Sequence, residues 1–254
     1  MTLLNKDELE VKIFETRVEM AQTAAFEIAE KIKTLLSKKN TINMIFAAAP
    51  SQSDTLSALI DCPNIPWNRI NAFHMDEYVG LPSSDSHSFG YFLSKAIFDK
   101  VPFKSVNYIK GDASDIGSEC DRYSQLIKNN RPDIVIMGIG ENGHIAFNDP
   151  DYADFKDDKI VKTVFLDQIC RNQQVNDGCF KTLDDVPKQA LTLTIPALIG
   201  TDAIFCIVPA ATKANAVKTM LNGDVSETCP ASILRTKNNA VMYLDDKSSS
   251  LLTL

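Results

Sequence analysis

Short apolar runs of strand length recur along the chain, and longer stretches with the 3.6-residue period of amphipathic helices separate several of them. The runs predict strands at 10–14, 42–49, 70–73, 106–109, 133–137, 160–166, 190–194, 203–208 and 240–244. The periodic stretches predict helices at 18–38, 87–99, 116–129 and 211–222. Many of the runs are continuously apolar, which is typical of strands buried on both faces.

This alternation predicts a single α/β domain over residues 1–254, with a three-layer αβα architecture. Its mostly parallel, Rossmann-like sheet is expected to carry helices on both faces. In such folds, ligands bind beyond the carboxyl ends of the strands. We therefore expect the turns near Pro50, Asp76, Gly140 and Pro209 to gather into one site.

The turn after the predicted strand 42–49 is rich in hydroxyl and amide side chains. We expect it to join a strand to a helix, with Ser51 or Ser53 as the helix cap. Backbone N–H groups at such a turn are able to face an anion. The sequence therefore predicts an anion-binding turn that contains Ser51, Gln52 and Ser53.

The composition is that of an ordinary globular enzyme, with 44% hydrophobic and 23% charged residues in a chain of 254. The net charge of −7 and the scattered Lys and Arg residues argue against a nucleic-acid partner. The first residues lack a secretory pattern, and no apolar run reaches the length of a membrane span. We expect a cytoplasmic protein whose partner is a small molecule and not a membrane. The sequence is compatible with a homo-oligomer.

Cysteine and histidine usage predicts neither disulfides nor a metal site. The six cysteines have no C-x-x-C spacing, and the chain has three histidines, His74, His87 and His144. These residues do not form a zinc set by spacing. We expect buried free thiols, no metal and no cofactor.

The run GIGENGHIAFNDP at 138–150 carries the densest candidate chemistry. Gly138, Gly140 and Gly143 spell the G-x-G-x-x-G of a dinucleotide-binding loop, but that loop must open a helix. Here β-branched and aromatic residues follow, and then Asn-Asp-Pro, which disfavours a helix. We interpret the glycines instead as a sharp turn that presents His144 at a strand's carboxyl end.

His144 is the first candidate for proton transfer, because imidazole is suited to that role near neutral pH. A lone histidine more often caps a turn or satisfies a backbone carbonyl, but three preceding glycines and the later carboxylate of Asp149 favour catalysis here. Asp76 and Glu77 are adjacent, so an extended segment turns them to opposite faces. We assign Asp76 to the pocket, with a turn-forming aspartate as the alternative.

Lys213 follows the turn at 209–212 and stands near the start of a predicted helix. A lysine beside a helix N-terminus is able to bind phosphate. The alternative is an ordinary solvated lysine on the helix surface.

Two segments together resemble the signatures of glucosamine-6-phosphate deaminases, also called glucosamine-6-phosphate isomerases. They are HMDEYVGLP at 74–82 and the run at 138–150, and the resemblance continues through DDVPKQALT at 184–192 and PAS at 230–232. It therefore covers nearly the whole chain. The related 6-phosphogluconolactonases share a glycine-histidine loop but usually continue it differently.

The resemblance implies a metal-free conversion of an amino-sugar phosphate to a ketose phosphate, with release of ammonia. It implies that His144 moves a proton at the ring oxygen, that Asp76 is the base at carbon 2, and that Asp149 orients His144, with Asn142 beside them. The substrate-binding residues that it implies, together with those from the turns, are Ser51, Gln52, Ser53, Glu77, Gly140, Gly143, Arg171 and Lys213.

The chain departs from the family pattern in three places. Asn142 stands where some members have Asp, and Asp149 stands where Glu is common. The sequence AAPSQS at 48–53 replaces a Thr-Gly-Gly-Thr/Ser-Pro phosphate loop. Of two arginines spaced five apart, Arg171 fits the first and Asn176 occupies the second.

The leading hypothesis is a deaminase/isomerase that acts on glucosamine 6-phosphate, with galactosamine 6-phosphate as the second candidate substrate. The alternative of a different class is a noncatalytic sugar-phosphate sensor, favoured by the altered phosphate loop. The retained pair of Asp76 and His144 favours the enzyme. A 6-phosphogluconolactonase is disfavoured by the residues after His144.

Overall fold

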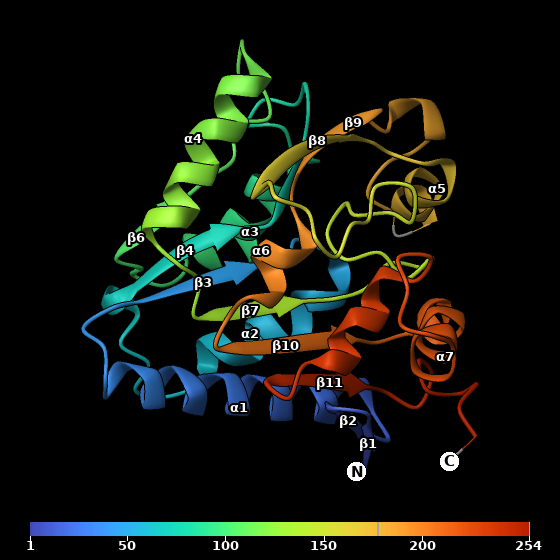
Figure 1. The fold of residues 1–254 in the computed structure, drawn as a ribbon. Helices are drawn as coiled ribbons and strands as arrows, with labels where there is room; N and C mark the ends of the chain where they lie inside the picture. Colours follow the sequence, from blue (N-terminus) through green and yellow to red (C-terminus); the bar gives the residue numbers. More distant parts are fainter. Residues whose placement is uncertain (177, 254) are drawn as a thin grey trace.

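A mostly parallel sheet with helices on both faces forms the core of the molecule, as the sequence predicts (Figure 1). The computed structural model describes residues 1–176 and 178–253. Within them, the sheet runs in the order β1-β2-β11-β10-β7-β3-β4-β6, with every neighbouring pair parallel except β1 and β2. The strands are β1 (Thr2–Lys6), β2 (Leu9–Ile13), β3 (Ile42–Phe46), β4 (Ile70–His74), β6 (Ser105–Asn107), β7 (Ile134–Met137), β10 (Ala203–Val208) and β11 (Ala240–Leu244).

Alternate residues of the central strands enter two separate hydrophobic clusters, one on each face of the sheet. In β7, Ile134 and Ile136 belong to one cluster, and Val135 and Met137 belong to the other. The first face is covered by α1 (Arg17–Leu36), α2 (Ser53–Asp61), α3 (Phe89–Leu93) and the π-helical turn η3 (Ser94–Phe98). The second is covered by α4 (Ile116–Asn129), α6 (Ile195–Ile199), α7 (Ala214–Asn222) and the 3₁₀ turn η6 (Pro230–Thr236).

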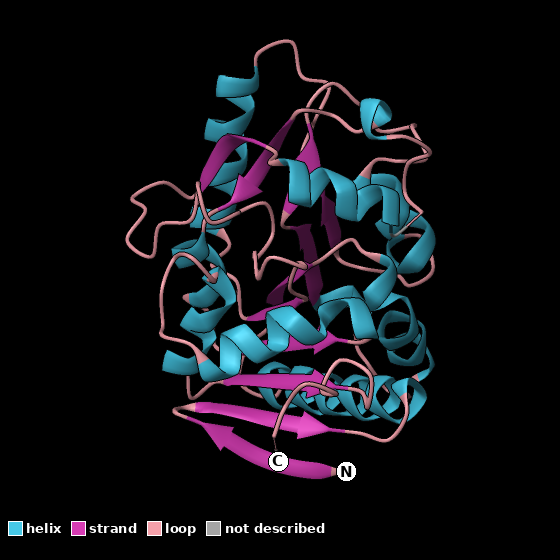
Figure 2. Ribbon diagram, turned by 90° about the vertical axis from the view of Figure 1, so that its right-hand side faces the viewer, coloured by secondary structure: helices cyan, strands magenta, loops and turns pink. Residues whose placement is uncertain are grey.

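The two chain ends lie on the same side of the molecule, near the edge strands β1 and β2 (Figure 2). The helices of the described part of the chain include none that is long and apolar enough to cross a bilayer. The edge strand β1 pairs antiparallel with β2 and was not predicted from the sequence.

Two of the predicted strands belong to a second, smaller sheet. β8 (Val161–Phe165) and β5 (Asp76–Tyr78) both pair antiparallel with β9 (Gln189–Leu193). In β8 the side chains of Val161 and Val164 are buried, whereas Thr163 and Phe165 are exposed. The expectation of one parallel sheet is therefore wrong for this region, because an apolar run alone does not reveal which strand it pairs with.

The helix after β3 is not capped in the way that the sequence predicts. Pro50 opens a 3₁₀ turn, η1 (Pro50–Gln52), and α2 then begins at Ser53 with Gln52 as its N-cap. No side chain caps this helix, so the predicted cap at Ser51 or Ser53 is wrong. The Gln52 side chain instead donates to Ser51 Oγ at 3.1 Å and to the Ile207 carbonyl at 3.1 Å.

The turn after β10 is held in an unusual backbone conformation. Ala210 has φ 82° and ψ 150°, a region that L-residues avoid because of the Cβ atom. Its N–H donates to both carboxylate oxygens of Asp245, each at 3.1 Å. Asp245 Oδ1 also accepts the Ser248 N–H at 2.7 Å. This turn leads through η5 (Ala211–Lys213) into α7, so it sets the position of Lys213.

We expect Ala210→Gly to keep or raise the free energy of unfolding, by up to about 1 kcal/mol, because glycine tolerates this conformation. Ala58→Gly, within α2, is the control and should lower the free energy of unfolding by about 1 kcal/mol. Urea denaturation of both variants measures the difference. A loss at position 210 as large as that at position 58 would contradict a strained turn.

Candidate active site

The candidate site is a cleft at the carboxyl ends of the central strands. After β3 the chain builds the sheet in one direction through β4 and β6, and after β7 it builds in the other direction through β10 and β11. Loops that leave β3 and β7 therefore diverge and leave a crevice between them, which is where ligands bind in such sheets. The cleft is lined from both sides of this point, by Ala47, Ala48, Ala49 and Ser51 after β3 and by Gly138, Ile139 and Gly140 after β7.

Asp76 and Lys213 also line this cleft. Asp76 comes from the start of β5, and Lys213 comes from the turn after β10. The prediction that four turns distant in sequence meet at one edge of the sheet is thereby confirmed.

The glycine loop after β7 is a turn that folds back on itself. Gly143 N–H donates to the Gly140 carbonyl at 3.0 Å, and Gly140 N–H donates to the His144 carbonyl at 2.9 Å. A Cβ atom at Gly140 would overlap the His144 imidazole. Gly143 has φ +81°, and a Cβ atom there would lie 2.7 Å from Cys229 Sγ. Turns rather than a helix follow at 141–160, which confirms that the three glycines are not a dinucleotide fingerprint.

His144 is paired with Asp149, and Asn142 holds both ends of the pair. His144 Nδ1 lies 2.8 Å from Asp149 Oδ1, and both side chains are buried. The side-chain NH₂ of Asn142 donates to Asp149 Oδ1 at 2.9 Å. The side-chain oxygen of Asn142 accepts the backbone N–H of His144 at 3.0 Å. The structure thus brings together three of the residues that the sequence predicted, with Asn142 in a positioning role.

Asn148 anchors this loop and was not predicted from the sequence. Its buried amide donates to the Ile145 carbonyl at 2.9 Å and to the Leu193 carbonyl of β9 at 2.9 Å. The loop that carries His144 is therefore fastened to the smaller sheet, which also carries Asp76 in β5. The sequence signal for this anchoring role is the position of Asn148 directly before Asp149, because an asparagine amide offers both donors and an acceptor to the backbone of a loop.

The carboxyl groups of Asp76 and Asp149 have opposite pKa shifts. Burial raises the pKa of Asp76 well above its usual range, and the nearby charge of Glu77 raises it further. Asp76 Oδ1 has no hydrogen-bond partner among the described residues. For Asp149, burial acts to raise the pKa, but the contacts with His144 and Asn142 outweigh it and lower the pKa. The cleft therefore holds a carboxyl group that favours its proton and a carboxylate that does not.

Glu77 points away from this cleft, so the expectation that it binds substrate there is not supported. Extended backbone in β5 turns Asp76 and Glu77 to opposite faces, as predicted from their adjacency. The Glu77 carboxylate accepts the Phe89 N–H at 3.0 Å and the Gly90 N–H at 2.8 Å, at the start of α3. Burial raises its pKa to about 7, although these backbone hydrogen bonds oppose the shift. Its geometry is that of a helix-terminal anchor.

Lys213 and Ser51, two residues predicted to bind an anion, both line the cleft. Lys213 is 5% exposed, which excludes a solvated surface lysine. Among the described residues that line the cleft, it is the cationic one. Its place at the start of α7 adds backbone N–H groups of a helix N-terminus to its charge.

Several predicted substrate-binding residues lie outside the cleft lining. Gln52 is buried behind Ser51, and Ser53 lines a separate hollow with Tyr91 and Lys95. The Arg171 guanidinium donates to the carbonyls of Leu183, at 2.5 Å, and Val186, at 3.1 Å. Gly143 shapes the loop from beneath, against Cys229. Direct contact with substrate is therefore not supported for these four residues.

Gln173 and Gln174 line the cleft and were missed from the sequence. Both lie on α5 (Gln168–Asn176), a short helix that was not predicted because its residues form no apolar stripe. Gln173 Oε1 accepts the Glu141 N–H at 2.9 Å, which joins α5 to the glycine loop. Amide side chains thus occupy the side of the cleft where an arginine was expected.

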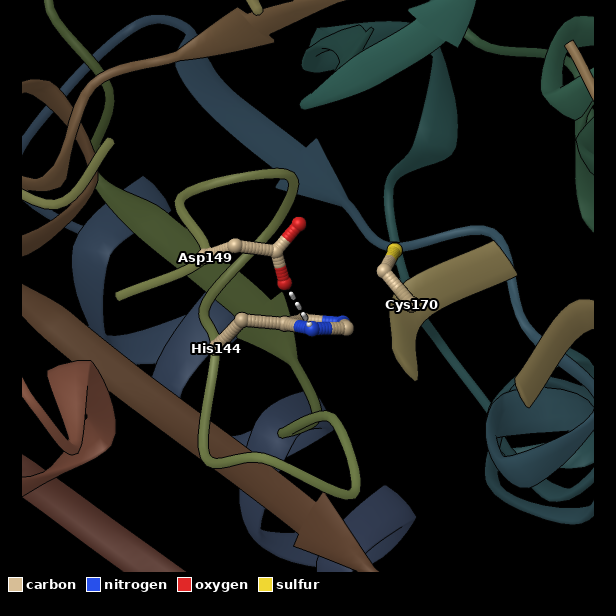
Figure 3. A group of neighbouring side chains, drawn as sticks. All are labelled: His144, Asp149 and Cys170. Carbon is tan, nitrogen blue, oxygen red and sulfur yellow. Dashed lines mark ion pairs between the residues drawn. The ribbon is translucent and has the colours of Figure 1, made fainter. Parts of the chain in front are cut away.

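One group of metal-capable side chains is brought together here. The side chains of His144, Asp149 and Cys170 are neighbours, with their ligand atoms within 4.8 Å of one another and Cys170 coming from α5 (Figure 3). Spacing along the chain did not predict this group, because Cys170 is 21 residues from Asp149. In the described part of the chain all six cysteines are free thiols.

Comparisons with known proteins identify the family to which the chain is similar. The family model of glucosamine-6-phosphate isomerases/6-phosphogluconolactonase matches residues 15–243. A glucosamine-6-phosphate deaminase of Bacillus cereus strain G9842 is 34% identical over 244 residues, which cover 96% of this chain and 89% of that protein. One of Bacillus thuringiensis strain Al Hakam is also 34% identical over the same shares.

Solved structures show the same fold. A monomeric glucosamine-6-phosphate deaminase superposes with a TM-score of 0.87 at 31% identity, over 95% of this chain and 99% of that one. A 6-phosphogluconolactonase from Thermotoga maritima has a TM-score of 0.77 at 21% identity, over 93% of this chain and 99% of that one, and shares the fold alone. The chain belongs to the family of glucosamine-6-phosphate isomerases and 6-phosphogluconolactonases.

Proposed function

We propose that this protein is an amino-sugar-phosphate deaminase/isomerase that converts glucosamine 6-phosphate and water to fructose 6-phosphate and ammonia. The observation that carries the proposal is a single cleft lined by the buried Asp76, whose pKa is raised by burial, and by His144, which is paired with Asp149. The relatives that are 34% identical over nearly the whole chain are named glucosamine-6-phosphate deaminases, which supports the same reaction.

In the proposed mechanism, His144 first moves a proton at the ring oxygen to open the pyranose. The Asp149 carboxylate orients the imidazole and stabilises its protonated form. Asp76 then removes the proton from carbon 2 and returns it to carbon 1, through an enolamine. Water replaces the amine at carbon 2, and ammonia leaves. Two carboxyl groups with opposite pKa shifts suit these separate roles.

The phosphate end is assigned to Lys213 and Ser51. A buried ammonium beside a helix N-terminus is suited to a dianion, and a serine hydroxyl supplies a further donor. Gln173 and Gln174 replace the charge of an arginine with neutral amides on the adjacent wall. We propose that they bind sugar hydroxyls or a phosphate oxygen, and that Arg171 supports α5 from outside the cleft.

An ammonia-release assay with a panel of amino sugars tests the function. We expect turnover of glucosamine 6-phosphate, or of its epimer galactosamine 6-phosphate, and at least 10-fold lower kcat/KM for unphosphorylated glucosamine. Asp76→Asn and His144→Gln should each lower kcat by about 10²–10⁴-fold, because each removes a proton carrier. No turnover of any amino sugar would contradict the enzyme and favour a sugar-phosphate sensor.

The pH dependence tests the role of Asp76. Because Asp76 must be ionised to act as a base and its pKa is raised, kcat/KM should rise with pH above the usual range of a carboxyl group. Glu77→Gln removes the negative charge that helps to raise this pKa, so the acidic limb should move to lower pH. Asp151→Asn, at an exposed carboxylate, is the control and should leave the limb in place. A limb unmoved by Glu77→Gln would refute the coupling.

Gly140→Ala tests whether the glycine loop exists to admit the His144 ring. The added methyl group overlaps the imidazole, so we expect kcat/KM to fall by about 10²-fold, as for a misplaced catalytic group. Gly117→Ala, in the first turn of α4, is the control and should retain activity. Circular dichroism checks that both variants fold. Full activity in a folded Gly140→Ala variant would show that the ring position is not critical.

A further inference from the structure

We propose that His144, Asp149 and Cys170 form a binding site for a thiophilic divalent cation, represented by Zn²⁺, and that the bound cation blocks the active site. Each residue offers one ligand atom, and the three atoms all lie within 4.8 Å of one another (Figure 3). The blocking effect rests on the proposed function of His144, whereas the binding of the cation does not.

The three side chains form a mixed donor set that suits zinc. Zinc in proteins binds imidazole nitrogen, carboxylate oxygen and thiolate sulfur, and three protein ligands leave a fourth position open. At the usual bond lengths of about 2.0–2.3 Å, tetrahedral ligand atoms stand roughly 3–4 Å apart. His144 Nδ1 and Asp149 Oδ1 lie 2.8 Å apart, and the three ligand atoms all lie within 4.8 Å of one another, so they can converge on one ion.

Carboxylate charge gathers around the Cys170 residue. The Asp167 carboxylate accepts the Cys170 N–H at 2.6 Å, and the Asn142 amide lies 2.9 Å from Asp149 Oδ1 and 3.4 Å from Asp167 Oδ2. Asp149 and Cys170 are both fully buried, and the thiol contacts the Asp149 carboxylate. A cation bound here therefore has carboxylate charge on more than one side, which offsets part of its desolvation.

A cation reaches the group from the cleft, because His144 lines it and the same helix that carries Cys170 contributes Gln173 and Gln174 to its wall. On binding, the Cys170 S–H bond breaks and its proton leaves to solvent, while the proton between His144 Nδ1 and Asp149 moves to Nε2 or to solvent. Metal–sulfur and metal–nitrogen bonds form in place of these two bonds to hydrogen. No oxidant or reductant is required. The bound ion then holds the imidazole of His144 and the carboxylate of Asp149, so neither is available for proton transfer.

Cobalt(II) is the spectroscopic probe of the site, because it replaces zinc and a thiolate ligand adds a charge-transfer band in the near ultraviolet. We expect the purified protein to show this band on titration with Co²⁺, and Zn²⁺ to displace it. Cys170→Ala and Cys170→Ser should both abolish the band, while Cys206→Ala, at another buried thiol, should keep it. No band in the unaltered protein, or a band that survives both Cys170 variants, would overturn the site.

Inhibition is measured separately on the same proteins. We expect micromolar Zn²⁺ to abolish ammonia release, a chelator to restore it, and Cys170→Ala to raise the inhibitory Zn²⁺ concentration at least 10-fold. Cys206→Ala should be inhibited like the unaltered protein. If cobalt binds through Cys170 but Zn²⁺ leaves turnover unchanged, the blocking effect is wrong. If the protein turns over no amino sugar, the cobalt titration still decides whether the site exists.

Discussion

The reversal of strand order between β3 and β7 is the constraint on which the rest of the molecule depends. Because these two strands are adjacent and parallel, and their successors lie on opposite sides, their loops separate at the carboxyl ends. The cleft lies in that gap, with small residues from the β3 loop on one wall and the glycine loop on the other. The smaller antiparallel sheet then adds Asp76, and α5 adds the two glutamines.

At that site, environment rather than residue type separates the pKa values of two aspartates. Asp76 and Asp149 are both buried, so desolvation disfavours the charge of each. Asp149 has His144 and Asn142 as partners, whereas Asp76 has the negative charge of Glu77 behind it. Neighbours therefore lower one pKa and raise the other. Adjacent Asp and Glu residues in an extended strand make this possible, because one faces the cleft and the other faces the start of α3.

The part of the cleft that we assign to the phosphate is where this chain differs most from the pattern that its sequence resembles. The arginine assigned from sequence spacing binds loop carbonyls instead, and α5 presents Gln173 and Gln174 to the cleft. Lys213 is then held in place by a turn whose strained residue, Ala210, is fastened to Asp245. The cationic charge in this part of the cleft therefore comes from Lys213, whose position depends on the backbone conformation of the turn at Ala210.

The sequence by itself determined the strands of the main sheet except β1, the exclusion of a dinucleotide loop, and the meeting of four turns at one edge. These follow from local periodicity, from the helix-breaking residues after Gly143 and from the rule for parallel strands. Only the tertiary structure decided that β8 and β9 pair in a separate sheet, that Arg171 donates to loop carbonyls outside the cleft lining and that Cys170 meets Asp149. The reason is that strand pairing and the direction of a long side chain depend on partners far away in the chain, and no local pattern records them.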